Sequence, residues 1–314
     1  MFSLRFCMSL KKIYVGAICN RDTEVFENIN KFLKLEYNIK IIDLLKNGVF
    51  NLKYFKKKLN KPLSLLIVKL HSEESNKAIY NAIKIYASQI PRLNSLRSVK
   101  ICESRKDVFK LVEAKCKNLT FPKCFYSINE AYEAVKNGIP LIIKLNTHNI
   151  RNLPHHDRIV GITTNIDDFL KLIKKYDIEN NQLFFQEYLG KFNNIYKVYG
   201  IDNYVQTITS HSLQEDNIDP HEFIHIRVPI DKELQRRIRR LGRKFGMKLY
   251  GIDYVLKDGT PYVVDINDFP SFKNVSEAVS LISELIYKLA SKKQVLEKIP
   301  FSLKIEPSMS IKVE

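Results

Sequence analysis

Two aspartates and an asparagine near the C-terminal end of the chain have the spacing of a metal site. Asp253 lies in the run GIDYVL, and Asp265 and Asn267 are two residues apart in the run YVVDIND. Alternate residues of a strand point to the same face, and an Asp-Gly turn at Asp258-Gly259 would bring Asp253 opposite them. Oxygen ligands of this kind suit Mg²⁺ that bridges nucleotide phosphates. The alternative is an exposed acidic hairpin.

Two further motifs lie upstream of this hairpin. Lys144 ends the apolar run IPLIIK, so its ammonium could point at a phosphate, although strands often end in lysine. In the run FFQEYL, the polar residues Gln186, Glu187 and Tyr188 interrupt an apolar strand. Such a segment could be a hinge along which an adenine lies, and edge-strand polarity would explain it equally well. Each motif is weak when taken alone.

The order of these residues along the chain is more informative than any one of them. The order is Arg105, Lys144, Gln186-Glu187-Tyr188, Lys197, Asp253 and then Asp265-x-Asn267. It resembles the nucleotide site of the ATP-grasp superfamily. The resemblance implies an α/β and α+β chain, with an N-terminal parallel-sheet domain and two α+β subdomains that enclose ATP. The central subdomain would supply basic residues and the hinge, and the C-terminal subdomain would supply the metal ligands.

Within that superfamily, the chain is similar to the inositol 1,3,4-trisphosphate 5/6-kinase family over its whole length. The matching motifs are Lys69-Leu70, Arg105, Lys197-Val198-Tyr199, Ser212-Leu213, Gly251-Ile252-Asp253 and Asp265-Ile266-Asn267-Asp268-Phe269-Pro270. Two features depart from the family pattern: the loop THNIRNLPHHDR has no glycine, and no arginine precedes the Ser-Leu pair.

The resemblance implies a role for each candidate residue in an ATP- and magnesium-dependent kinase of an inositol phosphate or similar polyanionic polyol. The substrate would contact Arg21, Lys69, His148, His156, Lys197 and Asn267. ATP would contact Arg105, Lys144, Gln186, Glu187, Tyr188 and Ser212. Magnesium, as two ions, would be held by Asp253, Asp265 and Asn267. The catalytic residues would be Lys144, Lys197 and Asp265.

Two other functions fit the same fold. A carboxylate–amine ligase would use the same metal ligands to make an acyl-phosphate and then a peptide-like bond. Many such ligases carry Asp-x-Arg where this chain has Lys197-Val198-Tyr199, and Glu-x-Asn where it has Asp265-x-Asn267, so both differences favour the kinase. The other function is non-enzymatic, in nucleotide sensing or nucleic-acid binding, and the intact set of metal ligands argues against it.

The elements that must position these motifs follow from hydrophobic periodicity. Strands are predicted at residues 13–18, 39–44, 65–69, 122–126, 139–144, 159–163, 183–189, 195–199, 204–208, 249–256 and 262–266. Helices are predicted at residues 23–35, 76–87, 106–115, 129–136, 167–176, 232–245 and 275–291. The first strands alternate with helices, which indicates a parallel sheet.

The length of 314 residues and a hydrophobic content of 45% indicate more than one subdomain. We place an N-terminal α/β substrate domain at 1–97, a central ATP-grasp subdomain at 98–190, a C-terminal metal-binding subdomain at 191–295 and a tail at 296–314.

The chain carries a net charge of +17, with lysine spread through most of it. This charge suits a polyanionic small-molecule substrate, or it reflects only the lysine-rich composition of the chain. The short basic runs are typical of solvated helix faces. Neither nucleic acid nor a membrane is therefore expected as a partner. The five cysteines are irregularly spaced, which favours a reducing, cytoplasmic setting over disulfides or zinc.

Overall fold

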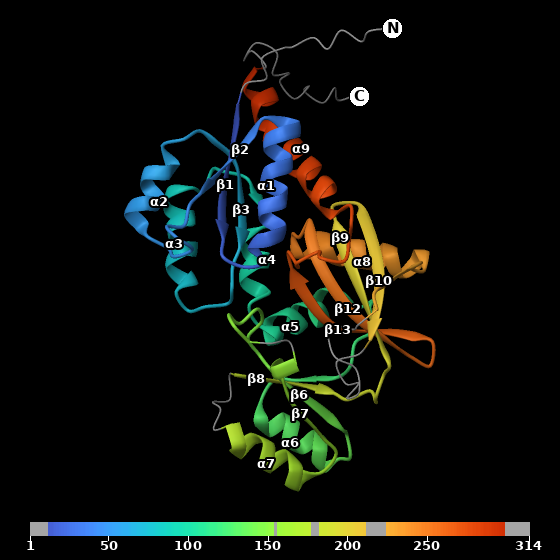
Figure 1. The fold of residues 1–314 in the computed structure, drawn as a ribbon. Helices are drawn as coiled ribbons and strands as arrows, with labels where there is room; N and C mark the ends of the chain where they lie inside the picture. Colours follow the sequence, from blue (N-terminus) through green and yellow to red (C-terminus); the bar gives the residue numbers. More distant parts are fainter. Residues whose placement is uncertain (1–11, 154–155, 177–181, 212–223, 299–314) are drawn as a thin grey trace, which may run out of the picture.

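The computed structural model describes residues 12–153, 156–176, 182–211 and 224–298. These residues form three sheets with helices against them (Figure 1). The N-terminal sheet lies at the top of the view, the large sheet with β12 and β13 lies beside it, and the small sheet with β6 and β8 lies at the bottom. The predicted mixture of α/β and α+β architecture is confirmed.

The N-terminal sheet is parallel and has the strand order β2-β1-β3-β4. β3 is buried along its whole length because α1 and α9 cover one face of the sheet and α2 and α3 cover the other. The elements are β1 (Ile13–Cys19), α1 (Thr23–Tyr37), β2 (Ile39–Asp43), α2 (Leu52–Leu59), β3 (Leu63–Lys69), α3 (Asn76–Tyr86) and β4 (Arg92–Leu93).

The small central sheet has the order β5-β8-β6-β7, and α6 and α7 cover one of its faces. The elements are α4 (Leu96–Ile101), α5 (Arg105–Lys115), β5 (Cys124–Phe125), α6 (Ile128–Lys136), β6 (Leu141–Leu145), η1 (His156–Arg158), β7 (Ile159–Thr163), α7 (Ile166–Tyr176) and β8 (Leu183–Glu187). The strand predicted to open at Pro122 is shorter in the structure, where β5 covers only Cys124 and Phe125. The residues just before it pair with β13 instead, because Val263 N donates to Thr120 O at 2.9 Å.

The third sheet is antiparallel, in the order β11-β10-β9-β12-β13. Both α8 and α5 pack against one of its faces. The elements are β9 (Asn194–Ile201), β10 (Tyr204–His211), β11 (Ile226–Val228), α8 (Lys232–Phe245), β12 (Leu249–Lys257), β13 (Thr260–Asp268) and α9 (Ala278–Lys298). The last helix therefore begins and ends later than predicted.

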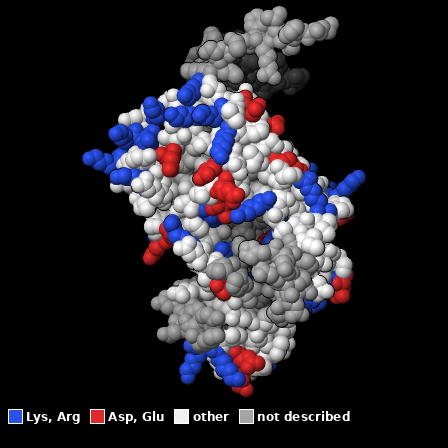
Figure 2. Space-filling view, viewed as in Figure 1, with Lys and Arg blue, Asp and Glu red and all other residues white. Residues whose placement is uncertain are grey.

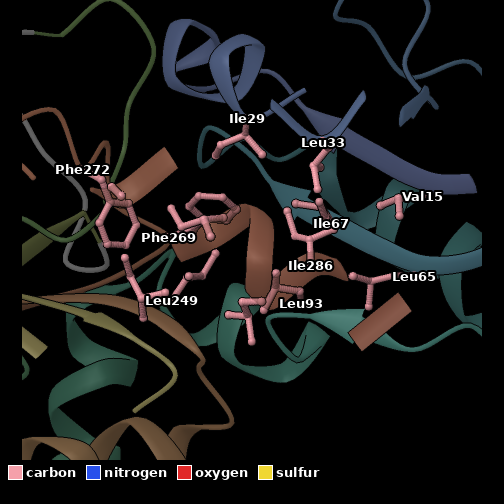
Figure 3. Close-up of a cluster of buried hydrophobic side chains, with 14 of the residues drawn as sticks. Val15, Ile29, Leu33, Leu65, Ile67, Leu93, Leu249, Phe269, Phe272 and Ile286 are labelled. Carbon is pink, nitrogen blue, oxygen red and sulfur yellow. The ribbon is translucent and has the colours of Figure 1, made fainter. Parts of the chain in front are cut away.

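The final helix returns to the N-terminal sheet, where red α9 lies beside blue α1 in Figure 1. Ile286 of α9 shares a buried cluster with Ile67 of β3, and the same cluster contains Leu249, Phe269 and Phe272 from the third sheet and the segment after it (Figure 3). One continuous apolar core thus joins the first and third sheets.

Two short helices are absent from the sequence-based prediction. In α2 only Phe55 is buried, and α4 has six residues, so neither presents a long periodic stripe. Both have N-cap side chains: Asn51 Oδ1 accepts from Tyr54 N at 2.9 Å, and Ser95 Oγ accepts from Ser98 N at 3.1 Å. Capping would have been the signal for these helices.

The surface charge is mixed on the face seen in Figure 2, where Asp and Glu lie between the many Lys and Arg side chains. Among the residues that the structure describes, no helix is both long and apolar enough to cross a membrane.

The third sheet meets α8 through a tyrosine packed on two glycines. A Cβ at Gly200 of β9 would lie 2.1 Å from Tyr250 Cζ, and a Cβ at Gly242 of α8 would lie 2.5 Å from Tyr250 Cε1. Such distances cannot exist without movement of the ring. The two glycines therefore fix how closely α8 approaches the sheet.

We expect Gly200→Ala to lower the free energy of unfolding by about 1–3 kcal/mol, because the added methyl group overpacks the Tyr250 ring. In a Tyr250→Leu background the same change should cost far less. Urea unfolding of the two single variants and the double variant would measure both effects. Additive losses would contradict the packing argument.

Candidate active site

The predicted metal hairpin has the expected register. Asp253 of β12 pairs directly with Asp265 of β13 on one side and with Lys197 of β9 on the other. Asn267 pairs with Gly251, so its side chain follows Asp265 on the same face. A bulge follows the Asp253–Asp265 pair and leaves Val264 without a partner of its own in the register. A lysine, two carboxylates and an amide thus share one face of three neighbouring strands.

Asp265 is held by residues of the central segment. His148 Nε2 lies 2.8 Å from Asp265 Oδ1, and the Arg105 guanidinium lies within 3.4–3.5 Å of both carboxylate oxygens. Burial and Arg105 lower the pKa of His148, so the ring is neutral at pH 7 and donates through Nε2–H. Burial would raise the pKa of Asp265, but His148, Arg105 and Lys144 hold it well below the usual value. Asp265 is therefore ionised.

The pKa of Asp253 is shifted in the opposite direction from that of Asp265. Burial and the charge of Asp265 raise its pKa to about 6, while Lys197 and Lys144 act against the rise. Two carboxylates face each other here with incomplete compensation, which is an environment that a divalent cation relieves. Within the described residues no group of three His, Cys, Asp or Glu side chains gathers around one point, so a metal here would need Asn267 or ligand oxygens as well.

Lys144 is one of the residues that line a pocket of about 110 Å³ between the small sheet and the third sheet. Its Nζ donates to Gln186 Oε1 at 2.9 Å and to Val264 O at 3.2 Å. Burial lowers the pKa of Lys144 to about 8, so the ammonium is still mostly protonated at pH 7. The pocket is lined by Pro122, Ile142, Lys144, Ile159, Gln186, Glu187, Tyr188, Leu189, Gly190, Phe192, Ile195, Val255 and Val264.

The apolar walls of this pocket were not predicted from the sequence. Ile142 is two residues before Lys144 and Val255 is two residues after Asp253, so alternation along each strand was the available signal.

Arg158 is a second residue of the site that was not predicted from the sequence. Burial and the charge of Arg105 lower the pKa of Arg158, while Asp265 raises it. The Arg158 guanidinium therefore interacts with the charges of both residues. Its Nε is buried without a hydrogen-bond partner among the described residues.

No family model matches the chain, and no curated protein matches it. Solved structures do. D-alanine–D-alanine ligase from Bacillus anthracis, complexed with ATP, has a TM-score of 0.64 and 15% identity, and the match covers 91% of this chain and 99% of that one. A RimK domain protein from Sphaerobacter thermophilus, described as ATP-grasp, has a TM-score of 0.63 and 9% identity, with coverage of 88% and 98%. The macrocyclase MdnC from Microcystis aeruginosa, bound with precursor peptide MdnA, has a TM-score of 0.60 and 14% identity, with coverage of 89% and 99%.

The chain has the ATP-grasp fold. In this ATP-grasp structure the predicted hinge residues Gln186, Glu187 and Tyr188 line the same pocket as Lys144. The pocket lies beside the face that carries Asp253 and Asp265. Of its lining residues, Val255 comes two residues after Asp253 in β12, and Val264 directly precedes Asp265 in β13. The residues assigned to ATP and metal from the sequence therefore lie largely together, and none of the three similar structures named above is described as a kinase.

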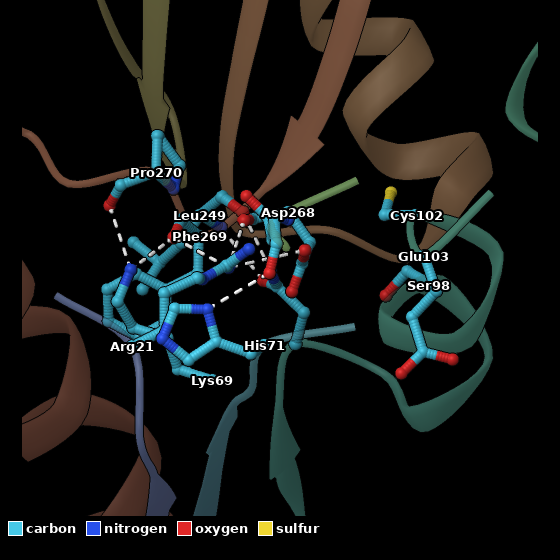
Figure 4. A network of polar contacts seen from close by, with 12 residues as sticks. Arg21, Lys69, His71, Ser98, Cys102, Glu103, Leu249, Asp268, Phe269 and Pro270 are labelled. Atoms are coloured by element: carbon cyan, nitrogen blue, oxygen red, sulfur yellow. Dashed lines mark hydrogen bonds and ion pairs between the residues drawn. The ribbon is translucent and has the colours of Figure 1, made fainter. Parts of the chain in front are cut away.

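Three of the predicted substrate contacts are buried against other groups of the protein. Arg21 and Lys69 are 4% and 1% exposed, because their charged groups bind oxygen atoms of Asp22 and of the segment 268–270 (Figure 4). The ring of His148 is 1% exposed and faces Asp265, so it supports a predicted metal ligand instead of an open surface. Ser212 and the side chain of His156 lie outside the described residues.

The raised pKa of Asp253 predicts an effect on stability. The fold disfavours its ionised form, so the cost grows as the pH rises from about 4 to about 6 and is complete above that. Asp253→Asn should raise the free energy of unfolding of the metal-free protein by about 1–3 kcal/mol at pH 8 and by about half of that at pH 5.

Urea unfolding at both pH values would measure this gain, with Asp258→Asn in the exposed turn as the matched control. Mg²⁺ should then stabilise the wild-type protein with ATP present and should not stabilise Asp253→Asn. Equal stabilisation of the two proteins by Mg²⁺ would exclude Asp253 as a ligand.

Proposed function

We propose that this chain is an ATP- and magnesium-dependent enzyme, and that its chemistry is that of a carboxylate–amine ligase. The observation that carries the proposal is the position of Lys144, which joins the apolar pocket to the face with Asp253 and Asp265. A purely apolar pocket could hold many ligands. A pocket lined by an ammonium that interacts with two carboxylates suits a base against its apolar walls and metal-bound phosphates beside the ammonium.

Each part of the nucleotide has a matching group. The adenine would lie between Ile142 and Val264, against the strand end at Glu187 and Tyr188. Lys144 would contact the phosphates, and Arg105 would add positive charge from the other side of Asp265. Magnesium held by Asp253, Asp265 and Asn267 would offset the phosphate charge.

The ligase chemistry follows from transfer of the γ-phosphoryl group to an acceptor carboxylate. A carboxylate oxygen forms a bond to the γ-phosphorus, the bond to the β,γ-bridging oxygen breaks, and ADP leaves. An amine then forms a bond to the acyl carbon, inorganic phosphate leaves, and the amine loses a proton to solvent. Positively charged side chains placed around the transferred group would stabilise its negative charge without bonding to it covalently. These side chains are Lys144, Arg105 and Lys197.

Two observations support a carboxylate acceptor over a polyanionic polyol. The similar structures include D-alanine–D-alanine ligase and a peptide macrocyclase. In addition, two of the cations that would hold inositol phosphates, Arg21 and Lys69, are buried against protein oxygen atoms. The inositol phosphate kinase is the second candidate, because the segment Asp265–Pro270 resembles the metal motif of that family.

The two candidates release different products, so one screen separates them. A ligase should release ADP and inorganic phosphate together, and only when a carboxylate and an amine are both present. A kinase should release ADP without inorganic phosphate when a polyol phosphate is present. The screen would follow both products with Mg-ATP and panels of amino acids, dicarboxylates and inositol phosphates.

Asp265→Asn is the control for either activity, because it removes the charge that faces the metal while keeping the shape of the side chain. We expect it to lower turnover by about 100-fold or more. ADP release without phosphate, seen only with an inositol phosphate, would overturn the ligase proposal in favour of the kinase. Turnover that is unchanged in Asp265→Asn would contradict both.

A further inference from the structure

The last residue of β13 and the two residues after it are held by side chains of the N-terminal domain. Asn267 is followed directly by Asp268, Phe269 and Pro270, whose backbone carbonyl groups face the ends of β1 and β3 (Figure 4). Phe269 has a φ of +36°, in a region that phenylalanine seldom adopts. A backbone of this shape needs partners that hold it.

Lys69, at the end of β3, is one of those partners. Its Nζ donates to Phe269 O at 2.6 Å, to Pro270 O at 3.4 Å and to Asp22 Oδ2 at 2.8 Å. An ammonium has three N–H donors, and here three protein oxygen atoms accept from them. The Phe269 ring also lies 4.7 Å from the ammonium. Lys69 is therefore satisfied within the protein and has no donor left for a substrate phosphate.

Arg21 binds the same segment one residue earlier. Its Nη2 donates to Asp268 O at 2.9 Å, to Phe269 O at 3.2 Å and to Asp268 Oδ1 at 3.4 Å. Asp268 is 3% exposed, so this guanidinium also compensates a buried carboxylate. The two cations thus bind three consecutive carbonyl groups directly after Asn267.

We propose that Arg21 and Lys69 are positioning residues, through which the N-terminal domain sets the backbone that carries Asn267. This inference rests on the proposed function for the role of Asn267 as a metal ligand. It assigns to the two cations a task other than binding a polyanionic substrate. The N-terminal sheet then does more than border the active site, because removing one of its lysines disturbs magnesium binding about 200 residues further along the chain.

The test compares Lys69→Met with Lys273→Met. Lys273 Nζ lies 3.6 Å from Glu24 Oε2, so it also links the C-terminal part to the N-terminal domain, but both side chains are exposed and neither binds the 268–270 carbonyl groups. Two quantities are measured: amide hydrogen exchange in the peptide 266–272, and the Mg²⁺ concentration that gives half-maximal ATP binding.

For Lys69→Met we expect exchange about tenfold faster in that peptide and a Mg²⁺ requirement about tenfold higher. For Lys273→Met both quantities should stay within about twofold of the wild-type values. If Lys69→Met does not fold, Arg21→Gln serves in its place, since it removes the charge while keeping an amide donor. The same two shifts are expected for it.

Unchanged exchange and an unchanged Mg²⁺ requirement in a folded Lys69→Met protein would overturn the proposal. So would a rise confined to the KM of the acceptor substrate, because that result would mean direct substrate contact. If the wild-type protein itself binds no ATP with Mg²⁺, the proposed function fails. The exchange measurement still decides whether Lys69 holds the segment.

Discussion

The site depends on one constraint: the Asp265 carboxylate must stay ionised at a place that is mostly buried. A buried carboxylate needs compensating charge or hydrogen bonds, and Asp265 has both, from Arg105, His148 and Lys144. All three come from the segment between α5 and the loop after β6, whereas Asp265 belongs to β13. The contacts that fix the predicted metal ligand are therefore also among those that join residues 105–148 to the third sheet.

The third sheet uses one of its faces for two tasks. At one end of this face, Tyr199, Leu249 and Phe269 pack into the core shared with the N-terminal domain. At the other end, Lys197 lies two residues before Tyr199 in β9 and Asp253 lies four residues after Leu249 in β12, so both share the face of those residues. A register slip of one residue would turn both groups to the face covered by α8, so packing and chemistry are specified by the same alternation.

The sequence predicted the parts whose signal is local. The Asp-Gly turn and the alternating pattern were enough to place Asp253 opposite Asp265. The resemblance assigned Lys144 and Gln186 to one nucleotide site, and the two side chains are hydrogen-bonded to each other. It could not predict the partners of Lys69, because a cation that ends a strand suits a phosphate or a backbone carbonyl equally well. The deciding oxygen of Phe269 lies 200 residues away. The pocket walls were missed because single apolar residues in strands usually indicate only a core.

The central claim is that the pocket at Lys144 and the carboxylates Asp253 and Asp265 form one site for ATP with magnesium. Calorimetric titration of ATP into the wild-type protein, with and without Mg²⁺, tests it most directly. The account predicts one ATP per chain with a Kd of about 1 μM to 1 mM in the presence of Mg²⁺, and binding weaker by about tenfold or more in its absence. No measurable binding, or the same affinity in both conditions, would contradict it, because the two carboxylates would then have no metal to hold beside the nucleotide.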